Sequence, residues 1–215
     1  MKDQAYIIIG GPQASGKSVA QRHIGRTYRN IVVLREAAQV LLEGERQKGI
    51  VLGGALVDRE FETRVLQFDL ERMRNITHKP SNNIYVDESN IFTVAHARAK
   101  NMDLAEMLFL KYRQALSSFS TGVVFIHVTP EVSWRRREPA YVRRYQGSPD
   151  FEDRMKRSKE YIFQLYRHLT TLYQALSYPK QQVEGSVPFY KFEKDVETAF
   201  EKVCQGIGTR FERRL

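Results

Sequence analysis

A glycine-rich segment near the start of the chain constrains the fold more than any other feature. Residues 11–18 read Gly-Pro-Gln-Ala-Ser-Gly-Lys-Ser, and they follow a strand-like apolar run at 6–9. Two glycines five residues apart, followed by Lys and then Ser or Thr, form the pattern of a loop that binds phosphate between a strand and a helix. The pattern therefore predicts that a nucleoside triphosphate binds here together with Mg²⁺.

Each part of this segment has a physical role. Gly11 and Gly16 permit backbone angles that a side chain forbids, so the chain can wrap a phosphate at the start of a helix. We expect Lys17 to reach the β- and γ-phosphates of ATP and the Ser18 hydroxyl to bind Mg²⁺. The residues expected to contact the nucleotide are Gly11, Pro12, Gln13, Ala14, Ser15, Gly16, Lys17, Ser18 and Val19.

Length and composition favour one α/β domain over residues 1–215. An apolar content of 42% suffices for a full core and excludes a disordered chain. Cys204 has no second cysteine with which to form a disulfide, which fits a reducing compartment. No signal peptide and no apolar run of membrane-spanning length is visible, so we expect a cytoplasmic protein with no membrane contact.

Apolar strand-like runs alternate with helical patterns along the chain. Strands are predicted at 5–9, 31–34, 84–86, 122–128 and 187–192, and helices from 17, from 36, at 57–77, 91–100 and 104–117, from 130, and at 151–177 and 194–205. Gly44, Gly49, Gly53 and Gly54 predict a mobile connection. This alternation predicts a parallel sheet covered on both faces, with the ligand site at the carboxyl ends of the strands.

Charged residues follow two of these predicted strands. Glu36 comes after the second strand, where its carboxylate would accept a proton from an acceptor hydroxyl, and Arg35 would hold an anionic acceptor. Asp87 ends the third strand and is our choice as the Mg²⁺ ligand, while Glu88 beside it would play the same part or activate water. Which of Glu36, Asp87 and Glu88 acts as the base stays open.

An arginine-rich segment follows the fourth predicted strand. Five arginines lie between Trp134 and Tyr145, and we interpret residues 134–150 as a lid bracketed by Pro139 and Gly147. We expect Arg137 and Arg143 to neutralise the transferring phosphoryl group and Arg135 to bind the nucleotide. The alternative is a solvated basic face, which is the usual fate of such a charge run.

Two further residues are candidates for the acceptor side of the site. Arg98 would supplement the lid arginines, and Phe92 would stack on an acceptor base, although aromatic side chains belong more often to the core. The histidines show no ligand spacing, so no zinc or haem site is predicted.

With these residues assembled, the chain resembles the thymidylate kinase and deoxynucleoside kinase group of P-loop kinases over nearly its whole length. Leu34-Arg35-Glu36 is similar to the Arg-Glu-Pro element of the first family and to the glutamate base of the second. Asp87-Glu88-Ser89 stands where these families carry Asp-Arg-Tyr or Glu-Arg-Ser, and residues 124–131 resemble their fourth strand. The stretch 35–38 is also similar to small ATPase domains of the nicotinamide riboside kinase type.

The resemblance implies a three-layer P-loop NTPase fold with the strand order 2-3-1-4-5, and it suits a homodimer formed through the helices around 57–77 and 91–117. Two departures bear on the substrate. Glu88 stands where both families have an arginine, and Ala37 replaces the proline. The identity of the acceptor therefore stays open.

Together these features predict an ATP- and Mg²⁺-dependent kinase that phosphorylates a small acceptor, a nucleoside or a nucleoside monophosphate. One alternative is an NTPase in which Glu88 activates water and hydrolysis drives a partner. Another is a polynucleotide end kinase, suggested by the net charge of +9, which would bind nucleic acid with a steep dependence on salt.

Overall fold

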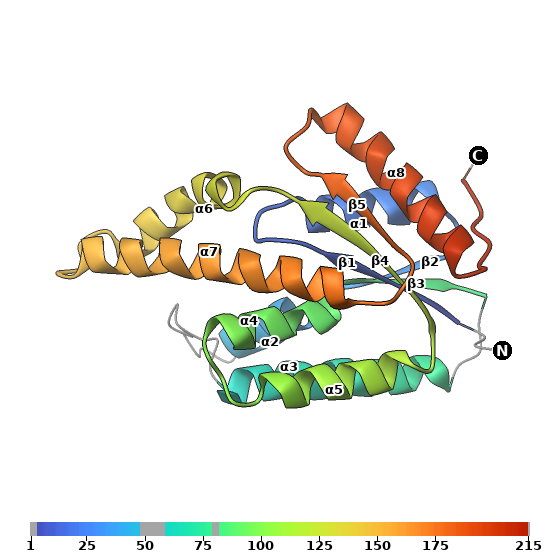
Figure 1. Ribbon diagram of the computed structural model, residues 1–215, viewed down its shortest axis with the longest axis horizontal. Helices are drawn as coiled ribbons and strands as arrows, with labels where there is room; N and C mark the ends of the chain where they lie inside the picture. Colours follow the sequence, from blue (N-terminus) through green and yellow to red (C-terminus); the bar gives the residue numbers. More distant parts are fainter. Residues whose placement is uncertain (1–3, 48–58, 79–81, 215) are drawn as a thin grey trace.

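Five parallel strands form the centre of the computed structural model, which describes residues 4–47, 59–78 and 82–214. The strands are β1 (Ala5–Gly10), β2 (Ile31–Leu34), β3 (Ile84–Glu88), β4 (Ser120–His127) and β5 (Lys180–Glu184). They lie in the order β2-β3-β1-β4-β5, and every neighbouring pair is parallel (Figure 1). The predicted α/β class, the all-parallel sheet and the strand order are thereby confirmed.

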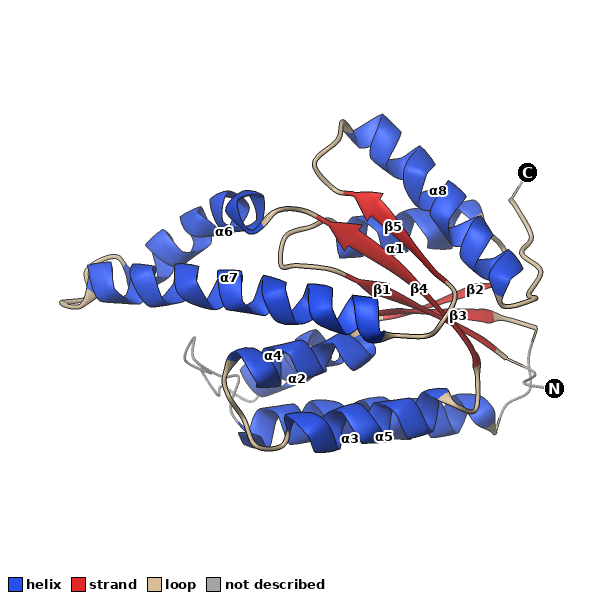
Figure 2. Ribbon diagram, viewed as in Figure 1, coloured by secondary structure: helices blue, strands red, loops and turns tan. Residues whose placement is uncertain are grey.

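Helices cover both faces of this sheet (Figure 2). One face is covered by α1 (Lys17–Thr27) and α8 (Phe189–Gly206). The other is covered by α3 (Arg59–Thr77), α4 (Thr93–Ala99), α5 (Ala105–Leu116) and α7 (Phe151–Ala175), with the short 3-10 helix η1 (Asn90–Phe92) before α4. Helix α2 (Ala37–Gln47) packs on α3, while α6 (Pro130–Tyr145) packs on α7 in a hairpin that extends beyond the sheet.

The two cores explain why the strands read as continuous apolar runs. Along β1, Tyr6 and Ile8 point into the core under α3, α4, α5 and α7, whereas Ile7 and Ile9 point into the core under α1 and α8. Successive strand residues face opposite ways, so a strand covered on both faces must be apolar at nearly every position.

Part of the sequence prediction lies outside the described residues. Gly49, Gly53, Gly54 and the first residues of the helix predicted at 57–77 belong to the stretch 48–58, which the structure does not describe. Among the described residues, no helix combines the length and the apolar character that crossing a membrane requires.

The predicted fifth strand at 187–192 is wrong. The strand β5 ends at Glu184, Pro188 immediately precedes α8, and that helix starts at Phe189 instead of 194. The sequence misled because β5 is an edge strand in which only Val183 is buried, so it has no apolar run. The apolar residues after it belong to the first turn of a helix.

The segment 134–150, which we interpret as a lid, comprises most of α6 and the turn that leads to α7. Pro139 lies inside α6, which runs without interruption to Tyr145, and Gly147 lies in the short turn to α7. Since proline has no N–H, Pro139 leaves the carbonyl of Arg135 without its helical hydrogen bond. The arginines are therefore presented by a helical arm.

Candidate functional site

The segment 10–18, here called the glycine-rich loop, joins β1 to α1. Gly11 has φ +142° and Gly16 has φ +107°. A Cβ on Gly11 would lie 2.3 Å from the carbonyl oxygen of Ile126, so no other residue fits there without a shift of the backbone. Glycine is thus required at this position by both backbone conformation and close packing.

Polar groups inside this loop lack partners among the described residues. The Ser15 side chain is buried, and its Oγ makes no hydrogen bond. The ammonium group of Lys17 donates a hydrogen bond of 3.0 Å to the carbonyl of Pro12, within the loop itself. A buried hydroxyl donor without an acceptor and a lysine folded over the same loop suit an oxyanion ligand.

Glu88, and not Asp87, faces the glycine-rich loop. The hydroxyl of Ser18 donates to Glu88 Oε2 at 2.8 Å, and Lys17 Nζ lies 4.0 Å from Glu88 Oε1. Glu88 pairs in register with Ile9, whose side chain faces α1, while Asp87 pairs with Ile8 on the opposite face. The expectation that Asp87 lies beside Ser18 is therefore wrong, because the alternation of the strand turns its carboxylate away.

Glu36, two residues after the end of β2, lies close to Lys17 and Glu88. Ser89 Oγ donates to Glu36 Oε1 at 3.3 Å. Burial raises the pKa of the Glu36 carboxyl, the nearby Lys17 ammonium opposes this, and Glu88 adds to the rise. Ser89 itself has φ +77° and ψ −64°, a conformation that costs free energy and is typical of functional sites. The structure thus brings Glu36, Glu88, Lys17 and Ser18 together.

Asp87 belongs instead to a buried ionic cluster on the other face of β3. We define this cluster as Tyr6, Asp69, Arg72, Asp87, Asn90 and Tyr112. Arg72 Nη2 donates to Asp69 Oδ1 at 2.6 Å and to Asp87 Oδ2 at 2.7 Å. Asp87 also accepts hydrogen bonds from Tyr6 and from Asn90, and Asp69 accepts one from Tyr112. Burial, the largest cause, raises the pKa of Asp87. Sequence reasoning missed this cluster, although Asp69 and Arg72 at i and i+3 share one helix face.

The cluster predicts a dependence of stability on pH. Burial, and then the charge of Asp87, raise the pKa of Asp69 from 3.8 to about 7. A carboxyl with a raised pKa contributes stability below pH 3.8, and this is lost as the pH rises through about 7. We therefore expect the melting temperature of Asp69→Asn, whose amide oxygen can still accept from Arg72 and whose amide nitrogen can donate to the Tyr112 oxygen, to fall less than that of the wild type between pH 4 and 7. Equal slopes in thermal melts of the two proteins would contradict this.

Helix α6 is docked on the glycine-rich loop by residues that the sequence did not single out. Ser133 Oγ donates to the carbonyl of Gln13 at 2.7 Å. The guanidinium of Arg136 donates to the carbonyls of Ala14 and Gly185, each at 3.0 Å. Nothing in the sequence distinguishes Arg136 from the other four arginines of this segment.

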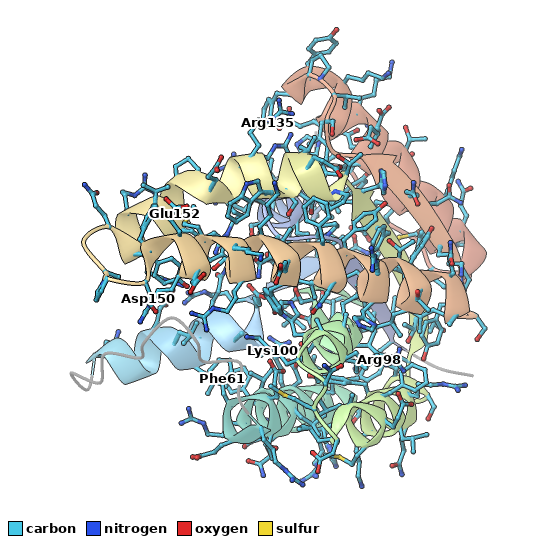
Figure 3. The ribbon with its side chains drawn as sticks, turned by 60° about the vertical axis from the view of Figure 1, so that its left-hand side comes forward. Phe61, Arg98, Lys100, Arg135, Asp150 and Glu152 are labelled. Atoms are coloured by element: carbon cyan, nitrogen blue, oxygen red, sulfur yellow. The ribbon has the colours of Figure 1, made fainter. Side chains whose placement is uncertain are left out.

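The three lid arginines that we chose are placed differently. Arg137 is half-buried, its Nε has no partner among the described residues, and its guanidinium lies 5.6 Å from the ring centre of Tyr141. Arg135 is exposed, on the outer side of α6 (Figure 3). Arg143 is exposed and follows Ser133 by ten residues, or about 15 Å along a helix. Of the three, only Arg137 combines partial burial with an unused donor.

Phe92, Arg98 and Arg35 do not join the site. Phe92 is buried against Phe125 and beneath Gly10, so it is a core residue. Arg98 pairs with Glu106 at 2.8 Å on the far side of α7 from Arg135 (Figure 3). The Arg35 side chain is exposed and bonded to Glu43 at 2.6 Å.

His96, for which the sequence predicted no role, lies near Lys17. His96 on α4 shares a hydrogen bond of 2.7 Å with the hydroxyl of Tyr161 on α7. Burial, and then the charges of Lys17 and Lys100, lower the pKa of His96 to about 4, so its imidazole is neutral at neutral pH. No local sequence pattern points to His96, because its partner Tyr161 lies on another helix, 65 residues further along the chain.

A scan of protein-family models and a search of curated proteins found no match to this sequence.

Proposed function

We propose that the protein is a P-loop kinase that uses Mg-ATP to phosphorylate a small acceptor, a nucleoside or a nucleoside monophosphate. One observation carries this proposal. Glu88 binds the Ser18 hydroxyl at 2.8 Å, while Glu36, on the neighbouring strand end, is held by Ser89 and is coupled electrostatically to the same Lys17. Two carboxylates with different partners flank one lysine, so one can bind a metal on the donor side while the other acts on the acceptor.

The nucleotide side rests on the geometry of the glycine-rich loop. Gly11 allows the backbone to approach closely, the Ser15 hydroxyl has an unused hydrogen, and Lys17 exchanges the Pro12 carbonyl for phosphate oxygens. Arg136 and Ser133 hold the loop from α6, and the unused Nε of Arg137 is available for the γ-phosphate. These groups bind and orient a triphosphate at the start of α1.

The residues that would hold Mg²⁺ are Ser18 and Glu88. A hydroxyl and a carboxylate are the oxygen ligands that this ion prefers, with water and phosphate oxygens completing its shell. When bound, the ion neutralises charge on the phosphate oxygens during transfer. Glu88 takes the role that the sequence analysis assigned to Asp87.

Glu36 would act on the acceptor. Its carboxylate takes the proton of the acceptor hydroxyl as that oxygen bonds to the γ-phosphorus and the bond from phosphorus to the bridging oxygen of ADP breaks. A raised pKa suits this role, because a base works best when its pKa approaches the working pH. The neutral His96 and its partner Tyr161 offer uncharged polar contacts to an acceptor near Lys17.

The test is release of ADP from Mg-ATP, measured alone and with nucleosides, nucleoside monophosphates and nicotinamide riboside. Release that depends on one acceptor class would establish the kinase and name its substrate. Release indifferent to every acceptor would contradict it and favour the NTPase. Transfer only to 5′ or 3′ ends of oligonucleotides would replace the small acceptor by a polynucleotide.

Glu88→Gln tests the metal side. We expect the concentration of Mg²⁺ needed for half-maximal ADP release to rise about tenfold or more, because a neutral amide is a weaker ligand for a hard cation. The matched control is Glu160→Gln, an exposed position on α7. A magnesium titration of Glu88→Gln that overlays the wild type would rule out the assignment.

A further inference from the structure

The strand ends that carry Glu36 and Glu88 are held from both faces of the sheet. From the α1 face, Gln21 Nε2 donates to the carbonyl of Leu34 at 2.7 Å and to that of Val86 at 2.9 Å. These carbonyls lie two residues before the two carboxylates. Neither strand end can shift relative to the other without breaking one of these bonds.

From the opposite face, Arg72 of α3 joins the same two strand ends closer to the carboxylates. Its Nη1 donates to the carbonyl of Arg35 at 2.7 Å, and that carbonyl belongs to the peptide bond with Glu36. Its Nη2 donates to the side chain of Asp87, the residue before Glu88, at 2.7 Å. One guanidinium thus touches the residue directly before each proposed functional carboxylate.

The acceptors of Arg72 are themselves fixed. Asp87 is fully buried and accepts hydrogen bonds from Tyr6 on β1 and Asn90 on η1, while Asp69 is held by Tyr112 on α5. Arginine suits this position because a planar fork donates in several fixed directions, whereas the lysine ammonium is a compact point charge. A lysine at 72 would keep a positive charge beside the two aspartates but not the reach to both strand ends.

We propose that Arg72 is a positioning residue that sets the separation between Glu36 and Glu88 by tying the ends of β2 and β3 together. The inference rests on the proposed function for its effect on turnover, but the tie itself is a property of the strand ends. Arg72 lies on α3, so this helix carries the tie. A pocket of about 470 Å³, lined by Phe68, Glu71, Arg72, Asn75, Ile76 and Tyr85, opens beside this helix and includes no residue of the glycine-rich loop.

The experiment compares Arg72→Lys with Arg74→Lys, an exposed position on the same helix. We expect kcat of Arg72→Lys to fall about 10- to 100-fold, because a small displacement of reacting groups costs rates of this order. The KM for ATP should stay within about threefold, since the contacts of the glycine-rich loop are untouched. Arg74→Lys should behave as the wild type. Both proteins are assayed at a temperature at which circular dichroism shows them folded.

A second measurement needs no turnover and so separates this inference from the proposed function. Hydrogen exchange followed by mass spectrometry should show faster exchange in peptides covering 34–40 and 86–92 in Arg72→Lys and not in Arg74→Lys. If the wild type lacked kinase activity, the proposed function would fail. The exchange result would still show whether Arg72 holds the ends of β2 and β3 together. Unchanged exchange, or a lower melting temperature with unchanged kcat, would make Arg72 a purely structural residue and overturn the inference.

A third variant covers the case in which a lysine at 72 prevents folding. In Arg72→Ala, added guanidinium ions should restore part of kcat, because they can reoccupy the space between the two strand ends. The same ions should not rescue a variant of Lys17. Absence of rescue in a folded Arg72→Ala protein would count against positioning by the guanidinium.

Discussion

Replacing Lys17 by alanine is expected to lower acceptor-dependent ADP release by about 10² to 10³-fold, the cost of removing one preorganised charged donor from a transition state. In the structure this ammonium lies over the glycine-rich loop, 3.0 Å from the Pro12 carbonyl and 4.0 Å from Glu88. It is therefore placed to follow negative charge on the β- and γ-phosphates. Binding of a fluorescent ATP analogue should weaken in parallel.

The matched control is Lys111→Ala, an exposed lysine on α5 far from the loop in sequence. Its kinetics should equal those of the wild type. Melting temperatures of both variants should stay close to the wild type, because among the described residues Lys17 donates one side-chain hydrogen bond, to the carbonyl of Pro12. If Lys17→Ala turned over at the wild-type rate, the loop would take no part in the reaction, and the kinase proposal would be contradicted.

Glu36→Gln is expected to lower kcat with a hydroxyl acceptor by about 10² to 10⁴-fold, the usual contribution of a general base. The KM for ATP should change little, because the role proposed for Glu36 is on the acceptor side. Burial and the charge of Glu88 raise the Glu36 pKa above its ordinary value of 4.5. Since the base acts when ionised, wild-type kcat should rise with pH through that raised pKa, and Glu36→Gln should lose this limb.

Glu43→Gln is the control for this variant, because Glu43 lies on the following helix α2 and pairs with Arg35 at the surface. The acceptor class decides the size of the effect. A phosphate acceptor of a nucleoside monophosphate has no hydroxyl proton to lose, so a loss of kcat with nucleosides alone would assign a nucleoside kinase. An unchanged kcat and an unchanged pH profile with every acceptor would contradict the role of Glu36 as a base.

Local patterns sufficed for much of this molecule. The glycine-rich loop is predictable because Gly11, Gly16, Lys17 and Ser18 are neighbours in the chain, and the positive φ at both glycines is a local requirement. The parallel sheet follows from apolar runs that alternate with helical patterns, and the helix after the loop starts at Lys17 as predicted. Glu36 could be placed because it lies two residues after the end of a short strand.

Patterns failed where an element is defined by its neighbours. The strand β5 buries only Val183, so its identity depends on pairing with β4 and not on its own composition. Phe92 was a candidate to stack on an acceptor base with the core as its alternative, and the packing of η1 against β1 buries it beneath Gly10. The run of arginines in α6 is uniform in sequence, and only the docking of the helix on the loop distinguishes Arg136 from Arg135.

The sequence by itself determined that a phosphate-binding pattern sits at the carboxyl end of a parallel sheet, because that information is carried by adjacent residues and by periodicity. It named Asp87 and Glu88 as a pair, from which we chose Asp87 as the Mg²⁺ ligand. Only the tertiary structure decided between them, since the register of β3 against β1 points Glu88 to Ser18 and Asp87 to Arg72. Such assignments depend on contacts between residues tens of positions apart, which no local pattern encodes.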